Sequence, residues 1–320
     1  MTKASPTSDW ASWAAIALLA AVVALLQCAA PLPIAGDSVA VLIAASGTLG
    51  AVAFFYRHVR RHDPFATMCI ALMQVLLFSA LAAVLSYFLA RGEGPLWDAT
   101  FTRWDHAFGL DWLTFVRWID SHPHIVLPLR LAYASLVLQI IALVVVLGFS
   151  ARLAQLRAVM FASILCGIVV VGISGLFPAI SNFAYLGLTG ADFRHLDPWA
   201  GTVHMPHLGA LRDGTIEIIR LDAMQGIVTF PSYHAGLSTV TMWGFWLTRI
   251  GWVRWPGITL AAATIVATPV DGGHYFVDVF AGMVIALASM AVAVRAVRWT
   301  PARPGLTASP FRRSRAVSAR

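Results

Sequence analysis

Long apolar runs alternate with more polar segments, two of them long, at residues 91–124 and 178–230. A helix needs about 20 apolar residues to cross a bilayer. Only one basic residue, Lys3, precedes the first run, so we expect a retained helix there and not a cleaved signal peptide. The pattern predicts an all-α, polytopic membrane bundle of about eight transmembrane helices, at residues 13–34, 39–56, 66–90, 125–149, 158–177, 231–247, 255–268 and 274–297.

The composition agrees with this pattern. Hydrophobic residues make up 59% of the 320 residues, and charged residues only 12%. These proportions lie outside the range of soluble domains and indicate an integral membrane protein. The three cysteines lie inside apolar runs without a CxxC motif, so we expect them to be packing residues: Cys28, Cys69 and Cys166.

The basic residues predict the orientation of the bundle. Short cytoplasmic loops carry an excess of Lys and Arg. Most of the 22 basic residues fall on the side that holds both chain ends, so we expect both termini in the cytoplasm of an inner (plasma) membrane. The long connections 91–124 and 178–230 then face the periplasm. The net charge of +7 fits an anionic membrane surface, and we expect no nucleic-acid partner.

The first outer connection is rich in aromatic residues at helical spacing, with Asp and Arg between them. This pattern is typical of an amphipathic helix at the membrane interface. The helix could form an aromatic belt or guide a lipid toward an outward-facing site. Its aromatic residues are Trp97, Phe101, Trp104, Phe108, Trp112, Phe115 and Trp118.

Two histidines stand where predicted helices begin at the outer surface. His234 follows Pro231, a favoured first residue of a helix. His274 and Asp278 are four residues apart, so on a helix they share one face and the carboxylate can accept the imidazole N–H. A histidine held in this way suits nucleophilic attack on phosphorus. The free N–H groups of two helix N-termini would add an anion site, which suits phosphate.

These motifs resemble the type 2 phosphatidic acid phosphatase superfamily, which shares its core with vanadium haloperoxidases. "PSYH" at 231–234 is similar to the family's P-S-x-H, and "HYFVD" at 274–278 is similar to its H-x-x-x-D. The resemblance implies that His274 is the phosphate nucleophile, Asp278 its orienting carboxylate and His234 the general acid. It also implies a six-helix core at residues 66–297, with two additional helices at 1–65. From its basic, Pro-, Ser- and Ala-rich composition we expect a cytoplasmic tail at 298–320.

Two family elements are absent from the chain. Ala267 and Thr268 stand where the family usually has Ser-Arg, and the K-x6-R-P element is missing. Together with "FPSYHAG" and "DGGHYFVD", these departures make the chain resemble the inositol phosphorylceramide synthase branch most. Members of that branch move a phosphoryl head group between lipids.

Other residues must then neutralise the phosphate. Arg130 lies inside a predicted span, where an arginine is costly unless it faces a polar cavity. It could equally extend to the interface. Arg194 with His207 is a further possibility in the second outer connection. We expect phosphate binding by Ser232, Arg130, Arg212, Arg220 and Gly273.

The predicted reaction is cleavage or transfer of the phosphoryl group of a lipid phosphate or phospholipid through a phosphohistidine. Water as acceptor gives a phosphatase, and an alcohol gives a head-group phosphotransferase. We expect no cofactor and no metal, since His204 and His207 lack a clear third ligand. The alternatives are a lipid-binding or transport protein without catalysis, and a haloperoxidase.

Overall fold

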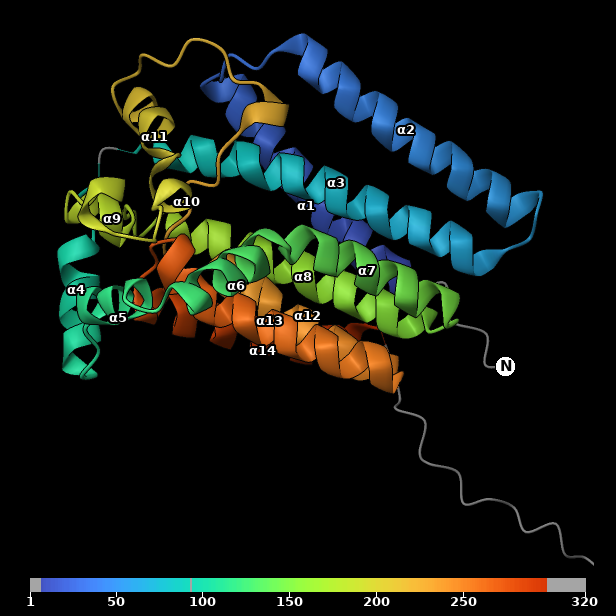
Figure 1. Cartoon of the computed structure of the whole chain (residues 1–320). Helices are drawn as coiled ribbons and strands as arrows, with labels where there is room; N and C mark the ends of the chain where they lie inside the picture. Colours follow the sequence, from blue (N-terminus) through green and yellow to red (C-terminus); the bar gives the residue numbers. More distant parts are fainter. Residues whose placement is uncertain (1–6, 93, 298–320) are drawn as a thin grey trace, which may run out of the picture.

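The computed structural model describes residues 7–92 and 94–297, and the regular structure of these residues is helical without strands. The longer helices form a bundle, and the shorter ones lie in the connections (Figure 1). The long helices are α1 Thr7–Ala29, α2 Gly36–His58, α3 Asp63–Ala90, α6 Pro123–Ala134, α7 Leu136–Phe149, α8 Leu153–Ser174, α12 Tyr233–Thr248, α13 Gly251–Asp271 and α14 Phe276–Ala296. The short helices are α4 Asp98–Ala107, α5 Trp112–Asp120, α9 Asn182–Tyr185, η1 Gly190–Asp192, α10 Trp199–Thr202, α11 Met205–Arg212 and η2 Leu221–Ala223.

Five of the described helices are long and apolar enough to cross a membrane: α1, α2, α3, α8 and α14. The α6–α7 pair gives a sixth span if its two parts, bent by 56°, cross together. The predicted spans 231–247 and 255–268 form α12 and α13. These two helices do not meet the same measure of length and hydropathy, and α12 has only 16 residues. The chain is therefore an integral membrane protein with five to six spans by length and composition, while eight spans stay a prediction.

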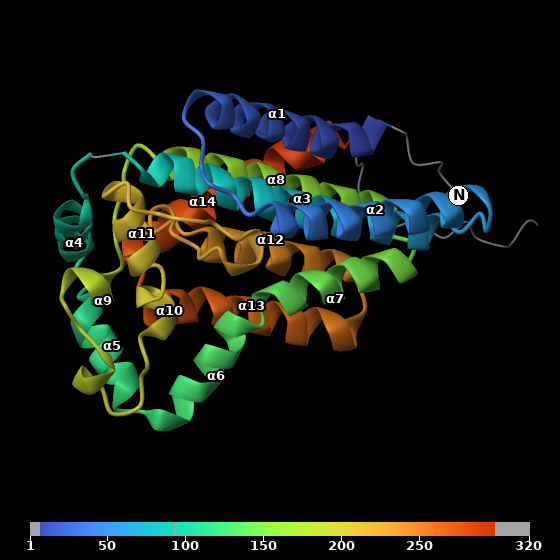
Figure 2. The same cartoon turned by 90° about the horizontal axis from the view of Figure 1, so that it is seen from above.

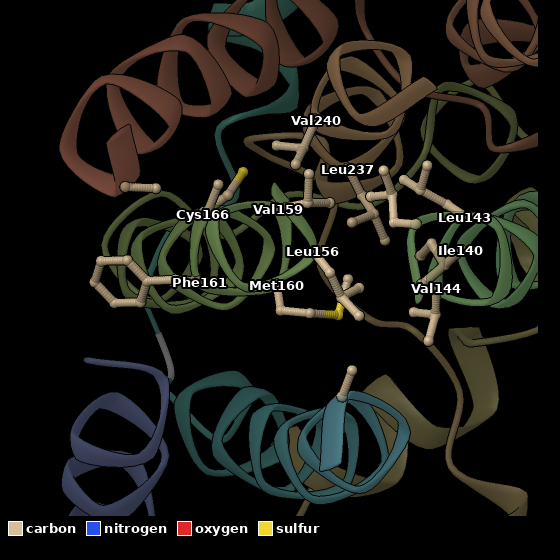
Figure 3. Close-up of a cluster of buried hydrophobic side chains, with 14 of the residues drawn as sticks. Ile140, Leu143, Val144, Leu156, Val159, Met160, Phe161, Cys166, Leu237 and Val240 are labelled. Carbon is tan, nitrogen blue, oxygen red and sulfur yellow. The ribbon is translucent and has the colours of Figure 1, made fainter. Parts of the chain in front are cut away.

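Helix α12 lies at the centre of the bundle, in contact with α7, α8, α13 and α14 (Figure 2). Side chains of α7, α8 and α12 interlock there without access to solvent (Figure 3). Leu143 of α7 lies against Gly244 of α12, where a Cβ atom would overlap it. Helices α12 and α14 also meet backbone to backbone, since a Cβ on Gly282 would overlap the carbonyl oxygen of Ser232. This close contact fixes the beginning of α12 beside the first turns of α14.

The short helices gather at one end of the bundle, and the described chain ends, at α1 and α14, lie at the opposite end (Figure 1). The two long connections therefore share one end of the molecule, as the sequence predicted. The tail 298–320 lies outside the described residues.

The prediction of one amphipathic helix in the first connection was wrong. The chain forms two helices, α4 and α5, because Gly109 adopts a positive φ of 73° and Asp111 caps a new helix by accepting from the Thr114 amide. Phe101 and Trp112 are buried, whereas Trp104, Phe108 and Trp118 are exposed. Part of the aromatic pattern therefore reflects packing within the protein.

Candidate active site

The turn that carries His274 is built against α9. Gly273 adopts a positive φ of 63°, a conformation that suits glycine. A Cβ on Gly273 would lie 2.7 Å from the Phe183 ring and 3.0 Å from the Ser181 side chain. The Asn182 amide donates to the Gly273 carbonyl oxygen at 2.8 Å. The turn is therefore fixed by its backbone conformation and by its contact with α9.

His274 contacts Asp278 as predicted. Nδ1 of His274 lies 3.3 Å from Oδ2 of Asp278, and both side chains are buried. His274 precedes the helix, however, and Asp278 lies in the first turn of α14, where it also accepts from the Tyr275 amide at 2.9 Å. With Nδ1–H donating to the carboxylate, Nε2 keeps its lone pair for a substrate.

Helix α4 holds the start of α14 through two buried carboxylates. Asp105 accepts from the amides of Phe276 and Val277, each at 2.9 Å. Asp98 accepts from the Tyr275 hydroxyl at 2.8 Å. Burial raises the pKa of Asp98 and of Asp105, although hydrogen bonds from neighbouring groups partly offset this effect. The amides at the start of α14 that we expected to bind phosphate thus already have protein partners.

His234 is the second residue of α12. The Ser232 hydroxyl caps this helix by accepting from the Ala235 amide at 3.3 Å, and Ser232 is fully buried. The His234 ring stacks on Tyr133 of α6, with 4.5 Å between ring centroids and 13° between the ring planes. The bent helix α6 therefore sets the ring plane of the expected general acid.

A cavity of about 230 Å³ brings His234 and His274 together with a third histidine, His204. Apolar residues of α3 and α8, among them Phe78 and Val171, form its inner wall. Residues 224–229, which precede the P-S-x-H motif, also line it. The cavity therefore joins a polar end with histidines to an apolar pocket inside the bundle.

His274 and His204 both lie outside the helices, and the burial of their imidazole rings favours the neutral forms. It lowers the pKa of His274 to about 4, against an opposing effect of a hydrogen bond to the Thr229 backbone. It also lowers the pKa of His204 to about 4, and the charge of a protonated His274 would lower it further. Both side chains are therefore neutral near pH 7.

The three arginines expected at the phosphate do not line the larger cavity. Nε of Arg130 is 3.8 Å from Oδ1 of Asp271. Arg220 pairs with Asp37 at 2.7 Å. Arg212 donates to the Gly94 carbonyl oxygen at 2.8 Å and lines a neighbouring cavity of about 30 Å³. Among the residues that the structure describes, the larger cavity is lined by no Lys or Arg. Whether any of these arginines binds phosphate stays a prediction.

Gly273 and His207, which the sequence also suggested for phosphate binding, do not line the larger cavity either. Gly272, and not Gly273, lines the larger cavity. His207 bonds to the Tyr87 hydroxyl at 2.5 Å, outside that cavity. Within residues 7–92 and 94–297, no three or more His, Cys, Asp or Glu side chains are grouped so that they could hold a metal ion. A site without metal or cofactor stays a prediction.

Sequence reasoning missed His204, Tyr133 and the carboxylates of α4. Asp98 and Asp105 are seven residues apart, which places them on one face of a helix and could have signalled a joint role. His204 and Tyr133 carry no comparable signal, because the turn between α10 and α11 and the bend of α6 bring them to the cavity.

Comparison with known proteins identifies the family. No curated protein and no solved structure matches the chain. A family model described as the PAP2 superfamily matches residues 99–292, more than half of the chain. The match covers α5 to α13 entirely, with nearly all of α4 and most of α14, and includes His234, His274 and Asp278. The chain therefore belongs to the PAP2 superfamily.

Proposed function

We propose that this protein is a membrane enzyme that cleaves or transfers the phosphoryl group of a lipid phosphate or phospholipid through a phosphohistidine intermediate. One observation carries the proposal. His274, which contacts Asp278, and His234 line a single cavity together with apolar residues of α3 and α8. The expected nucleophile and general acid thus share one space with room for an apolar substrate, and the orienting carboxylate is buried behind the nucleophile.

In the first step, Nε2 of His274 attacks phosphorus while the bond from phosphorus to the leaving oxygen breaks. Asp278 accepts the hydrogen bond from Nδ1–H and stabilises the positive charge that develops on the ring. His234 transfers a proton to the departing alkoxide. The products are the free alcohol and a phosphoryl group on His274.

In the second step, an acceptor hydroxyl attacks the phosphoryl group and His234 takes its proton. Transfer of the phosphoryl group releases His274 unchanged. Water as acceptor gives phosphatase activity, and a lipid or polyol hydroxyl gives head-group phosphotransferase activity. The absence of Ser-Arg at Ala267 and Thr268 supports the inositol phosphorylceramide synthase-like branch, and with it the transferase reaction.

We further propose that the site faces the periplasm, with both termini in the cytoplasm. The basic residues support this orientation. The histidine cavity lies at the end of the bundle that holds the two long connections, away from the described chain ends.

The experiment uses the purified full-length chain in lipid nanodiscs with a panel of phosphatidic acid, prenyl phosphates and phospholipids. We expect released phosphate or an exchanged head group from at least one member, and ³²P label on the protein when the phosphate is labelled. His274→Ala is expected to give neither product. Binding of lipid without either product and without labelled protein would instead support the non-catalytic alternative.

A further inference from the structure

A phosphoryl group in the larger cavity would need hydrogen-bond donors. None of the residues predicted to bind phosphate lines this cavity. Its described lining contains no Lys or Arg. Arg220 pairs with Asp37. Arg130 lies 3.8 Å from Asp271, with its Nη2 buried and without a hydrogen-bond partner among the described residues. The first amides of α14 are held by Asp105. Within the described lining, the hydrogen-bond donors available to an anion are therefore neutral groups.

His204 is placed to be such a donor. Its side chain lines the cavity together with His234 and His274, and the residue is only 4% exposed. Its Nε2 is buried and has no hydrogen-bond partner among the described residues. A buried polar atom without a partner is costly to the fold and is frequently found where a ligand binds.

The surrounding turn holds His204 in place. The His204 carbonyl oxygen accepts from the Leu208 amide at 3.0 Å at the start of α11. Next along this helix, His207 bonds to Tyr87 of α3, and the same tyrosine hydroxyl accepts from the Gln225 amide at 2.9 Å. On the other side of the turn, the Ser181 hydroxyl donates to the Gly201 carbonyl oxygen. The backbone of His204 is thus fixed from both sides, while Nε2 is left without a partner.

We propose that His204 is a phosphate-binding residue, whose Nε2–H donates a hydrogen bond to a phosphoryl oxygen in this cavity, where the described lining has no Lys or Arg. The proposal rests on the proposed function, because it assumes that a phosphoryl group enters this cavity. It assigns His204 to binding and leaves the bond-making steps to His274 and His234.

The test compares two substitutions of similar size. His204→Gln keeps an N–H donor at the end of the side chain, whereas His204→Met fills a similar volume without a donor. The probe is inorganic phosphate, titrated calorimetrically into the full-length protein in nanodiscs. We expect His204→Met to bind phosphate about 10- to 100-fold more weakly than the wild type, as for loss of a hydrogen bond to a charged group. His204→Gln should retain most of the affinity.

His195→Met is the matched control. His195 lies in the same outer connection, but its ring bonds to the Asp120 carbonyl oxygen and does not line the cavity. Its phosphate affinity should equal that of the wild type. If His204→Met does not fold, His204→Asn, whose shorter side chain withdraws the donor, replaces it in the comparison with His204→Gln.

The outcomes separate the two proposals. Equal phosphate affinity of the wild type, His204→Gln and His204→Met would overturn the role of His204, while the labelled phosphoenzyme would still support the proposed function. No phosphate binding and no labelled protein in the wild type would overturn the proposed function, and the role of His204 with it.

Discussion

At the scale of residues, His274 and His234 have different expected roles. His274, which contacts Asp278, is the expected nucleophile, and His234 is the expected general acid. A nucleophile is needed for every substrate, whereas a general acid is dispensable when the leaving group is already a weak base. We expect His274→Ala to lose activity on alkyl and aryl phosphates alike. His234→Ala should lose about 10²- to 10⁴-fold on an alkyl phosphate and less on nitrophenyl phosphate.

Initial rates of both variants on both substrates, with trapping of labelled protein, check these roles. A labelled His274→Ala protein would show that another residue attacks phosphorus. Equal losses of His234→Ala on the two substrates would remove its assignment as general acid.

A second prediction at this scale concerns Asp105 of α4. Its carboxylate accepts hydrogen bonds from the Phe276 and Val277 amides, just after His274. In Asp105→Asn, one of the two oxygens that accept the Phe276 and Val277 amides is replaced by an NH₂ group. We expect a loss of about 1–3 kcal/mol in the free energy of unfolding, as for an unsatisfied buried amide, and a lower kcat. Thermal unfolding and turnover measure the two effects. Asp197→Asn, at an exposed position, is the control, and a loss of the same size there would contradict a specific role for Asp105.

The sequence predicted the part of the site that is local along the chain. His274 and Asp278 are four residues apart, so their contact follows from local geometry. Asp105 reaches the same turn from a separate helix; its spacing from Asp98 indicates a shared helix face but not the segment that this face contacts. His204 is similar, since it lies in a long polar connection with other histidines, and only the folded turn brings it to the cavity.

At the scale of elements, the contact between α12 and α14 depends on the absence of side chains. In Gly282→Ala the added methyl group must push the start of α12 away, because the Ser232 carbonyl oxygen occupies its place. We expect this variant to lose about 1–3 kcal/mol of stability, and its turnover to fall because His234 shifts relative to His274. The measurements are thermal unfolding and turnover in nanodiscs.

Gly47→Ala is the matched control, since Gly47 lies within α2 and a Cβ there meets nothing within 4 Å. Alanine favours a helix by up to about 1 kcal/mol over glycine, so this variant should be at least as stable as the wild type. Equal destabilisation by both substitutions would show that the α12–α14 contact tolerates a methyl group.

The helices were easier to predict from the sequence than the bend between α6 and α7. The apolar run 125–149 gave no sign of the bend at Ser135, where the hydroxyl donates to the Ala132 carbonyl oxygen and the axis turns by 56°. Hydropathy records only that a segment is apolar. It does not record that α6 leaves the line of α7 so that Tyr133 can stack on His234.

At the scale of the whole molecule, the testable property is orientation. A reporter that is active only in the periplasm should be active when inserted near Gly190 and silent when fused after residue 320. This result is expected because most basic residues lie on the side of the chain ends. Activity of the fusion after residue 320 would reverse the orientation and move the site to the cytoplasm.

Helix α3 contributes to the histidine cavity although it lies outside the segment that the family model matches. The family model begins at residue 99, after α3, yet Phe78 and neighbouring residues of α3 form one wall of the histidine cavity. A chain cut down to the matched segment would keep His234, His274 and Asp278 but would lose the part of the cavity wall that α3 forms. The unit that encloses the histidine cavity is therefore longer than the segment that the family model matches.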